Sequence, residues 1–315
     1  MFFKLSRSLK VNRVLLISLS NIGDVVMTFP VFDALGTAFP DAAIDVVVGP
    51  KAVAFFKGNP YLSRLIPFNK RMLPLETLQW LAELRRTHFD LVIDLRNTFF
   101  PFLIRAKTVT SPFFHPDRMH MKDKHLARLT HVLGKPASFS ARRAIVLASE
   151  DKLSVKKLLG GWQDYVVIAP GAADARKRWM EAGFAALLEY FHERGQAVVF
   201  VGDKADRLIA DRLMPRVSGG VLNLCGQTTL LELAGILENA ALALVNDSGI
   251  MHLASYLDRP VLALFGPTDP FLYGPWGSCR GVLRQGTVME AIQPTDVVAA
   301  LRSLHLNLDT GPVLG

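Results

Sequence analysis

The stretch Asp247-Ser-Gly-Ile-Met-His252 follows the apolar run Ala240–Val245, and this junction decides the fold. In α/β proteins, an apolar strand that ends in a polar, glycine-containing turn and then begins a helix commonly binds phosphate. Backbone N–H groups and the helix dipole both point at the anion. The stretch therefore indicates a nucleotide-diphosphate site. The alternative is an ordinary strand-to-helix connection in which Asp247 or Ser248 caps the helix.

Short apolar runs alternate with helical patterns along most of the chain. The expected strands are Val14–Leu19, Ala43–Val48, Leu91–Asp94, Val166–Ala169, Gln196–Val201, Val221–Cys225, Ala240–Val245 and Val261–Phe265. The expected helices include 25–39, 75–86, 149–159, 181–194, 205–214, 230–239, 252–257 and 295–304. This alternation implies parallel pairing. We therefore expect an α/β protein with two doubly wound domains in series and a cleft between them.

Bulk composition limits the class of protein. The chain has 315 residues, of which 50% are hydrophobic and 20% charged, which is typical of a globular protein with two domains. Cys225 and Cys279 are the only cysteines, which excludes a disulfide framework and fits a reducing, cytoplasmic compartment. No apolar run reaches the roughly 18 residues needed to span a bilayer.

Positive charge is concentrated in the first half of the chain. Residues 1–160 hold 24 Lys and Arg against 12 Asp and Glu, whereas residues 161–315 hold 12 against 16. The stretch Arg105–Arg143 alone has nine Lys and Arg. Such a surface fits an anionic partner such as acidic lipid, a phosphorylated glycolipid or nucleic acid. The alternative is a solvated basic face. Nucleic acid is disfavoured because few aromatic residues lie among these cations to stack on bases.

The N-terminal segment mixes apolar and basic residues. Phe2, Phe3, Leu5 and Leu9 occur with Lys4, Arg7 and Lys10. This composition is compatible with a segment that lies on a membrane surface. The alternative is a packed or frayed terminus.

Two further strand ends carry reactive side chains. Asp24 follows Gly23 after the first strand, where a carboxylate can accept a proton from a substrate hydroxyl. Its alternative role is to cap the next helix. Lys177 lies on a loop with Gly171, and such a loop can place an ammonium group on a diphosphate. Its alternative is a solvated basic turn.

Several common cofactor motifs are absent from the sequence. Neither Gly-x-Gly-x-x-Gly after the first strand nor the Walker lysine pattern occurs, which disfavours dehydrogenases and NTPases. No Asp-x-Asp motif occurs, and His252 has no second histidine at the spacing of a zinc-ligand pair. We expect no cofactor and no metal. Lys177 and the turn at Ser248-Gly249 could stabilise a phosphate leaving group instead.

Five motifs follow one another in the order and spacing of a known family. They are Ile22–Pro30, Pro170-Gly171 with Lys177-Arg-Trp179, Gly226 with Thr228–Leu233, Asn246–His252, and Phe265–Pro270. Together they resemble glycosyltransferase family 9, the ADP-heptose:lipopolysaccharide heptosyltransferase family. The resemblance implies a GT-B fold with two Rossmann-like domains facing a central cleft. It implies an acceptor-binding domain over 1–160 and a nucleotide-sugar donor-binding domain over 161–315, whose last helix could pack back on the first domain.

The resemblance also implies roles for individual residues. Asp24 matches the family's proposed base, and Lys177 matches a lysine that contacts the donor diphosphate. Asp247, Ser248, Gly249 and His252 match residues around the donor sugar and phosphates. Asp206 is aligned with an acidic residue near the nucleoside, and the remaining expected donor-binding residues are Gly171, Ala172, Ala173 and Thr228.

Two departures from the family pattern affect this expectation. Met27 stands where many members have histidine. Ala172 and Ala173 stand where some members carry threonines on the phosphate loop. The diphosphate would then rely more on backbone amides, Lys177 and Ser248.

The expected function is inverting, metal-independent transfer of a heptose from ADP-heptose to a lipopolysaccharide core acceptor. The expected acceptor is an anionic lipid-linked glycan, met through peripheral contact with the acidic cytoplasmic face of the inner membrane. One alternative is a related transferase that uses another nucleotide sugar on a different cell-envelope glycan. The other is a non-catalytic nucleotide-sugar-binding protein.

Overall fold

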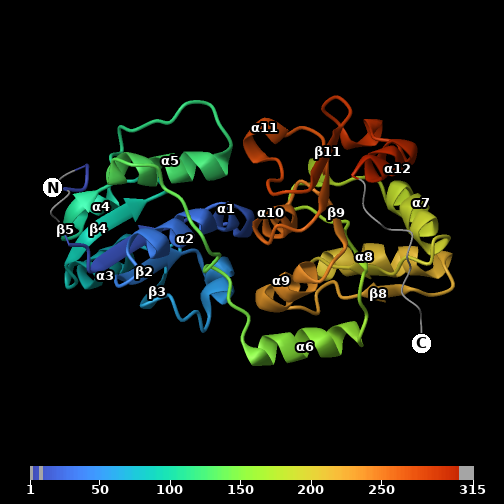
Figure 1. Ribbon diagram of the computed structural model, residues 1–315, viewed down its shortest axis with the longest axis horizontal. Helices are drawn as coiled ribbons and strands as arrows, with labels where there is room; N and C mark the ends of the chain where they lie inside the picture. The colour runs from blue at the N-terminus through green and yellow to red at the C-terminus, as the bar shows by residue number, and fades with distance from the viewer. Residues whose placement is uncertain (1–2, 7–9, 305–315) are drawn as a thin grey trace. The chain divides into compact units, whose positions relative to one another are not determined.

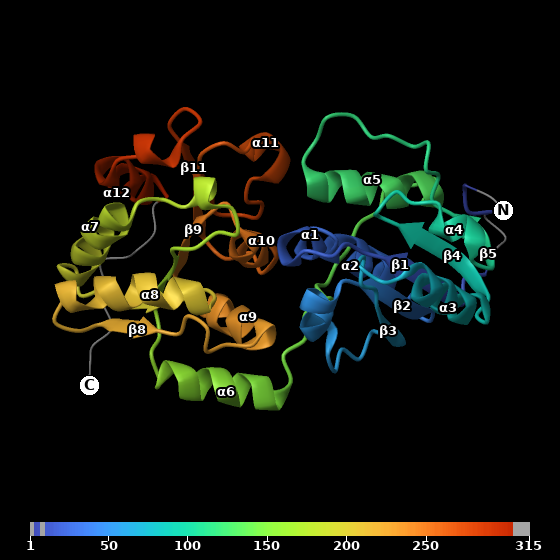
Figure 2. The ribbon, with the colours of Figure 1, turned by 180° about the vertical axis from the view of Figure 1, so that it is seen from behind.

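The computed structural model describes residues 3–6 and 10–304. Phe2, Arg7 and Leu9 of the N-terminal segment lie outside the described residues. The chain divides into two compact units, Met1–Val146 and Leu147–Gly315. Each unit has its own parallel sheet with helices packed on it (Figures 1 and 2).

The first unit is built on a five-stranded sheet with the order β3-β2-β1-β4-β5. Its strands are β1 (Arg13–Ile17), β2 (Ala43–Val48), β3 (Arg64–Pro67), β4 (Phe89–Asp94) and β5 (Ala106–Val109). Its helices are α1 (Ile22–Val26), α2 (Phe29–Ala38), the 3-10 helix η1 (Pro50–Phe56), α3 (Pro74–Arg85), α4 (Phe100–Leu103) and α5 (Met121–Leu133). The central strands are buried on both faces, so they are nearly continuous apolar runs.

The second unit is built on a six-stranded sheet with the order β11-β10-β9-β6-β7-β8. Its strands are β6 (Val166–Ala169), β7 (Val198–Phe200), β8 (Val221–Asn223), β9 (Leu242–Asn246), β10 (Val261–Phe265) and β11 (Arg280–Arg284). Its α-helices are α6 (Ser149–Leu159), α7 (Glu181–His192), α8 (Lys204–Leu213), α9 (Leu230–Glu238), α10 (Gly249–Tyr256), α11 (Pro270–Tyr273) and α12 (Pro294–Ser303). Its 3-10 helices are η2 (Ala175–Lys177), η3 (Met214–Arg216) and η4 (Met289–Ala291).

In both sheets the order of the strands reverses beside the first strand of the unit. β1 pairs in parallel with β2 on one side and with β4 on the other. β6 pairs in parallel with β7 on one side and with β9 on the other. The predicted α/β fold with two doubly wound units is therefore confirmed. In such sheets, ligands bind at the carboxyl ends of the strands where the order reverses.

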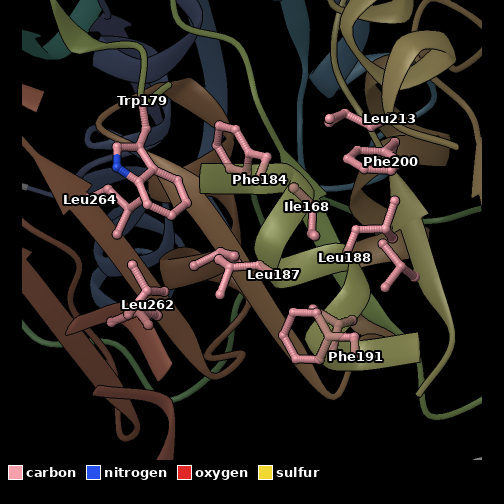
Figure 3. Packing of buried hydrophobic residues seen from close by; sticks show 14 of the residues in the cluster. Ile168, Trp179, Phe184, Leu187, Leu188, Phe191, Phe200, Leu213, Leu262 and Leu264 are labelled. Atoms are coloured by element: carbon pink, nitrogen blue, oxygen red, sulfur yellow. The ribbon is translucent and has the colours of Figure 1, made fainter. Parts of the chain in front are cut away.

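A large aromatic and aliphatic core holds the second unit together. Phe184, Leu187 and Phe191 of α7 pack against the sheet, as Figure 3 shows. Trp179 joins this core just before α7, with its ring 5.1 Å from that of Phe184. Its indole N–H donates to the Ile292 carbonyl at 2.9 Å. The segment between β6 and α7 therefore ends in a fixed anchor.

The predicted helix over 25–39 is interrupted in the structure. α1 ends at Val26 and α2 begins at Phe29. Pro30 lies in the first turn of α2, where its missing N–H costs nothing, whereas a continuous helix would need that donor. The Thr28 hydroxyl donates to the Val25 carbonyl at 2.6 Å and stabilises the break.

Other features also differ from the sequence-based expectation. The strands β3, β5 and β11 were not predicted, and all three lie at the edges of their sheets with partly exposed residues along them. α6 packs against α9 and is grouped with the second unit. α12 is preceded by Gln293 rather than capped by Thr295, and its Val297 and Leu301 lie in the core of the second unit.

A buried carboxylate links three neighbouring strands of the first unit. Asp45 on β2 is fully buried. It accepts hydrogen bonds from Arg13 on β1 at 3.2 Å and from Arg64 on β3 at 2.6 Å. Both guanidinium groups remain about one-third exposed, with side-chain exposures of 33% and 38%. The buried Asp45 carboxylate therefore has its hydrogen-bond partners, while both arginine side chains stay in contact with solvent.

We expect Asp45→Asn to lower the free energy of unfolding by about 1–3 kcal/mol, because the acceptor loses its negative charge and the carboxamide NH2 group would face the two arginine cations. Urea denaturation followed by circular dichroism measures this loss. The control is Asp123→Asn, which removes an exposed ion pair with Lys122 and should cost less than about 1 kcal/mol. Equal losses in the two variants would contradict the role given to Asp45.

Candidate active site

The predicted donor-binding residues follow the strands of the second sheet. The segment Pro170–Trp179 follows β6, and Asp247 to His252 follow β9. β6 and β9 are neighbours, with Ala169 opposite Val245. The two segments therefore leave the sheet side by side at the point where the strand order reverses.

Lys177 and Asp247 form an ion pair across this reversal point. The Lys177 ammonium lies 2.7 Å from Oδ2 of Asp247. The Asp247 side chain is 5% exposed and that of Lys177 27% exposed. The pairing shows that the two loops are within reach of each other. Neither side chain is the helix cap or the solvated turn that the alternative interpretations described.

Asn246, the last residue of β9, is hydrogen-bonded to both ends of the Lys177 loop (Pro170–Trp179). Its side-chain N–H donates to the Pro170 carbonyl at 2.8 Å, and its side-chain oxygen accepts from the Trp179 N–H at 3.2 Å. Asn246 is fully buried, so both bonds are formed away from water, where leaving either group unpaired is costly. The candidate residues named from the sequence did not include Asn246. The only sequence feature that could have identified Asn246 is its position, as a carboxamide residue at the end of an apolar strand.

Ser248 occupies the cap position of α10 without acting as a cap. The helix begins at Gly249, and the Ser248 side chain makes no capping hydrogen bond. Its hydroxyl oxygen is buried and has no hydrogen-bond partner among the residues that the structure describes. A buried polar atom in this condition is satisfied by a ligand or water. Ser248 and the first N–H groups of α10 therefore point to an anion site.

Asp206 lies against the start of the Lys177 loop. A Cβ atom added to Gly171 would lie 1.9 Å from Oδ1 of Asp206, so only glycine fits at that position. Oδ2 of Asp206 accepts from the Asp203 N–H at 2.9 Å. Burial raises the pKa of Asp206 above its ordinary value, although this hydrogen bond opposes the rise. The structure thus brings Asp206 against Gly171, in the loop that carries Lys177.

The other predicted donor-binding residues are placed less centrally. Ala172 is half-buried and Ala173 exposed on the outer part of the Lys177 loop. His252 is buried, and its ring stacks on Trp276 at a centroid distance of 5.6 Å. Thr228 follows β8, two strands away from β6, while its neighbour Thr229 caps α9 by accepting from the Glu232 N–H.

In the first unit, Asp24 lies just beyond the carboxyl end of β1. It is in the first turn of α1 and is half-buried. Its Oδ2 accepts from the side-chain amide of Asn21 at 2.8 Å. Asn21, not Asp24, occupies the cap position. The alternative that Asp24 caps the helix is therefore wrong, and its carboxylate keeps acceptor capacity for another proton donor.

The loop after the neighbouring strand β4 is fixed by Asp94, which the candidate residues did not include. Asp94 accepts from the backbone N–H and the hydroxyl of Thr98, both at 2.7 Å. Burial raises the pKa of Asp94, although these hydrogen bonds oppose the rise. Arg96 on the same loop donates to the Ser20 hydroxyl at 3.1 Å. Arg96 therefore joins the loop after β4 to the loop that carries Asp24.

The basic stretch Arg105–Arg143 does not form one uniform surface. Lys107 pairs with Asp90 at 2.7 Å, and the Arg143 guanidinium donates to the Gly36 carbonyl at 3.1 Å. Within α5, Arg128 donates to Asn97 on the β4 loop at 3.0 Å. Only part of the stretch is therefore available to an anionic partner. Arg128 and Arg96 are the cations held on or against the β4 loop.

His125 in α5 is neutral near pH 7. Burial, together with nearby Arg128, His120 and Lys124, lowers its pKa to about 4. Both ring nitrogens are buried and lack hydrogen-bond partners among the described residues. The basic stretch also contains His115, His120 and His131, and the neutral His125 does not act with them as one group of cations.

Comparisons with known proteins agree with this architecture. The model of glycosyltransferase family 9 (heptosyltransferase) matches residues 115–294. Lipopolysaccharide heptosyltransferase 3 of Escherichia coli is 27% identical, over 93% of this chain and 99% of that protein. Lipopolysaccharide heptosyltransferase 2 of Salmonella typhimurium is also 27% identical, over 96% of each chain.

Solved structures share the fold over nearly their whole length. A family 9 glycosyltransferase from Veillonella parvula superposes with a TM-score of 0.82 at 24% identity, covering 95% of this chain and 99% of that one. The E. coli ADP-heptose lipopolysaccharide heptosyltransferase II gives a TM-score of 0.77 at 22% identity, covering 95% of this chain and 100% of that one.

Among the described residues, no helix is long and apolar enough to cross a membrane.

The contact between Gly171 and Asp206 gives a test of the loop geometry. We expect Gly171→Ala to lower the free energy of unfolding by about 1–3 kcal/mol, because the new methyl group overlaps the Asp206 carboxylate. Adding Asp206→Ala removes the carboxylate, so the double variant should recover most of the loss. A double-mutant cycle measured by urea denaturation gives the coupling, and strictly additive losses would rule out this contact.

Proposed function

Because the chain belongs to glycosyltransferase family 9, the heptosyltransferase family, we propose that it transfers a heptose from ADP-heptose to a lipopolysaccharide core acceptor with inversion at the anomeric carbon. The names of its relatives support this substrate class. The observation that carries the proposal is the Lys177–Asp247 ion pair at the strand-order reversal beside α10.

The second unit would hold the donor. Lys177 and the backbone N–H groups at the start of α10 supply positive potential for the two phosphates. The buried Ser248 hydroxyl offers a hydrogen bond at the same place. Asp247 can accept hydrogen bonds from sugar hydroxyls once Lys177 turns to the diphosphate. We assign Asp206 to the nucleoside, and its contact with Gly171 at the start of the Lys177 loop supports that role.

The first unit would supply the base. Asp24 accepts the proton of the acceptor hydroxyl as that oxygen forms a bond to the anomeric carbon. The bond between this carbon and the diphosphate oxygen breaks on the opposite face, and its electron pair leaves with ADP. Lys177 and the N-terminus of α10 stabilise the charge that develops on the leaving phosphate. The chain's own cations carry this stabilisation, and the proposed mechanism is metal-independent.

The acceptor would be an anionic lipid-linked glycan. Arg96 and Arg128 are held on or against the β4 loop, next to the β1 loop that carries Asp24. Guanidinium groups suit carboxylates and phosphates because their geometry allows paired hydrogen bonds. The enzyme would act in the cytoplasm, with peripheral contact to the acidic inner face of the membrane.

Two other functions remain to be compared with this one. A related transferase could use another nucleotide sugar, and a screen of donors with the same acceptor separates that case. A non-catalytic binding protein would bind the donor without turnover. The half-buried Asp24 carboxylate, with acceptor capacity remaining, favours an enzyme.

If Asp24 is the base, Asp24→Asn should reduce kcat by about 10²–10⁴-fold, because the amide cannot accept the proton. Release of ADP in the presence of acceptor measures the rate, and calorimetry should give an unchanged Kd for ADP. Asp41→Asn is the control, since Asp41 is an exposed carboxylate of the same unit. A transfer rate equal to that of the wild type would remove Asp24 from the mechanism.

The ion pair predicts opposite effects of its two members on ADP binding. Lys177→Ala should weaken ADP about 10–100-fold, because a charge-assisted contact to phosphate is lost. Asp247→Asn should bind ADP at least as tightly as the wild type, because Lys177 no longer has a competing carboxylate, while sugar transfer falls. Arg176→Ala is the control, since Arg176 is an exposed cation of the same loop that pairs with Asp174. Calorimetry that shows equal ADP affinity for Lys177→Ala and the control would contradict the assignment.

A further inference from the structure

A cluster of exposed apolar side chains surrounds the short helix α4 in the first unit. Phe99 is 68% exposed, Leu103 48%, Phe102 38% and Phe3 37%. The Phe102 ring lies 6.1 Å from that of Phe99 and 6.2 Å from that of Phe3. The three rings therefore form one continuous group. Single exposed apolar residues are ordinary on protein surfaces, whereas contiguous groups mark contact sites.

The cluster is presented by a fixed scaffold. Phe100, between Phe99 and Phe102, points inward and packs on Phe68 and Trp80 at ring distances of 5.7 and 5.9 Å. Pro101 and Ile104 are also buried. The same short segment thus directs some side chains into the core and others to solvent, so the outward rings keep their positions without a partner.

Both chain segments that carry the cluster are tied to the body of the unit. Thr98, next to Phe99, is held by the Asp94 carboxylate through its backbone N–H and its hydroxyl. The segment with Phe3 is tied to α5, because the Leu5 N–H donates to the Val132 carbonyl at 2.8 Å. α4 and β5 lie next to each other in both views (Figures 1 and 2).

The charged residues next to the cluster in the chain are basic. Lys4 adjoins Phe3, Arg105 follows the end of α4, and both are exposed. The 22 residues from 95 to 116 contain no Asp or Glu. Residues 1–146 as a whole hold 21 Lys and Arg against 10 Asp and Glu. An apolar surface with a basic rim is complementary to the headgroup region of an acidic bilayer, where aromatic rings and lysine or arginine side chains gather.

We propose that Phe3, Phe99, Phe102 and Leu103, with Lys4 and Arg105 beside them, form a docking surface for an acidic lipid bilayer. The inference deepens the proposed function, because it names the surface that would bring the enzyme to a lipid-linked acceptor. The rings enter the interface between headgroups and acyl chains, and the two cations contact anionic headgroups. Binding is peripheral and reversible, since the apolar area is small.

Vesicle co-sedimentation of the full chain tests the surface. Vesicles of phosphatidylethanolamine and phosphatidylglycerol should bind the wild type more strongly than vesicles of phosphatidylcholine. Phe99→Ser with Phe102→Ser should weaken binding to the acidic vesicles at least tenfold. Lys4→Gln with Arg105→Gln should remove most of the preference for acidic vesicles, and 0.5 M salt should weaken the wild type in the same way, at a Debye length of about 4 Å.

The control replaces two exposed leucines of the second unit, Leu153→Ser with Leu208→Ser, whose side chains are 69% and 61% exposed. This variant should bind vesicles as the wild type does. The Kd for ADP and the thermal midpoint of the aromatic variant should equal those of the wild type, because the replaced rings are exposed and belong to the other unit. These two measurements show that the fold is intact.

Wild-type binding by the aromatic variant would overturn the proposal, as would equal losses in the aromatic and control variants. A change in oligomeric state by light scattering with unchanged vesicle binding would assign the cluster to self-association and also overturn it. The proposed function fails separately: no heptose transfer by a wild type that binds acidic vesicles would remove the transferase activity and leave the docking surface standing.

Discussion

The reversal of strand order between β6 and β9 is the constraint on which the donor site depends, and the buried Asn246 carboxamide makes it usable. The carboxyl ends of these two parallel neighbours lie side by side at one edge of the sheet, where ligands bind in such folds. Asn246 pairs with one backbone group at each end of the Lys177 loop. The loop is held at Pro170 and at Trp179, and Trp179 is itself anchored in the core. The backbone at Lys177 is therefore held in place. Its ammonium therefore reaches Asp247 rather than solvent.

In the first sheet, the loops at the strand-order reversal are held by different side chains. At its reversal point, between β1 and β4, the Asp94 carboxylate closes the β4 loop on itself through Thr98. Arg96 then bridges to Ser20 on the β1 loop. The second unit offers one lysine, a helix N-terminus and a buried hydroxyl, which suits a diphosphate. The first unit offers a carboxylate and partly buried guanidinium groups, which suits proton removal beside an anionic acceptor. The two units share a topology but differ in the side chains at the strand ends, and the proposed roles of the two units rest on that difference.

Periodicity predicts the buried strands of this chain well, because strands buried on both faces are short apolar runs bounded by turns. The predicted bounds of β2, β6 and β10 agree with the structure. The edge strands β3, β5 and β11 were not predicted, because exposed or half-buried residues interrupt their apolar pattern. Strand ends also predict where site residues lie. They do not predict which polar residue closes a loop. Asn246 acts through backbone groups that are distant in sequence and leave no local pattern, and Asp94 bonds the nearby Thr98 without forming a recognisable motif.

The two departures from the family pattern bear differently on the site. Met27 is 1% exposed at the end of α1, so the side chain at this position contributes to packing in the first unit. Its identity therefore need not alter the proton-accepting chemistry of Asp24, whose carboxylate accepts a hydrogen bond from Asn21. Ala172 and Ala173 lie on the outer, partly exposed part of the Lys177 loop, where threonine hydroxyls could reach a bound phosphate. Without these threonine hydroxyls, the hydroxyl of Ser248 is the one available beside Asp247, and it is buried at the start of α10. Donor binding in this chain should therefore depend more on Ser248 and on the backbone of α10 than it does in members with a threonine-containing loop.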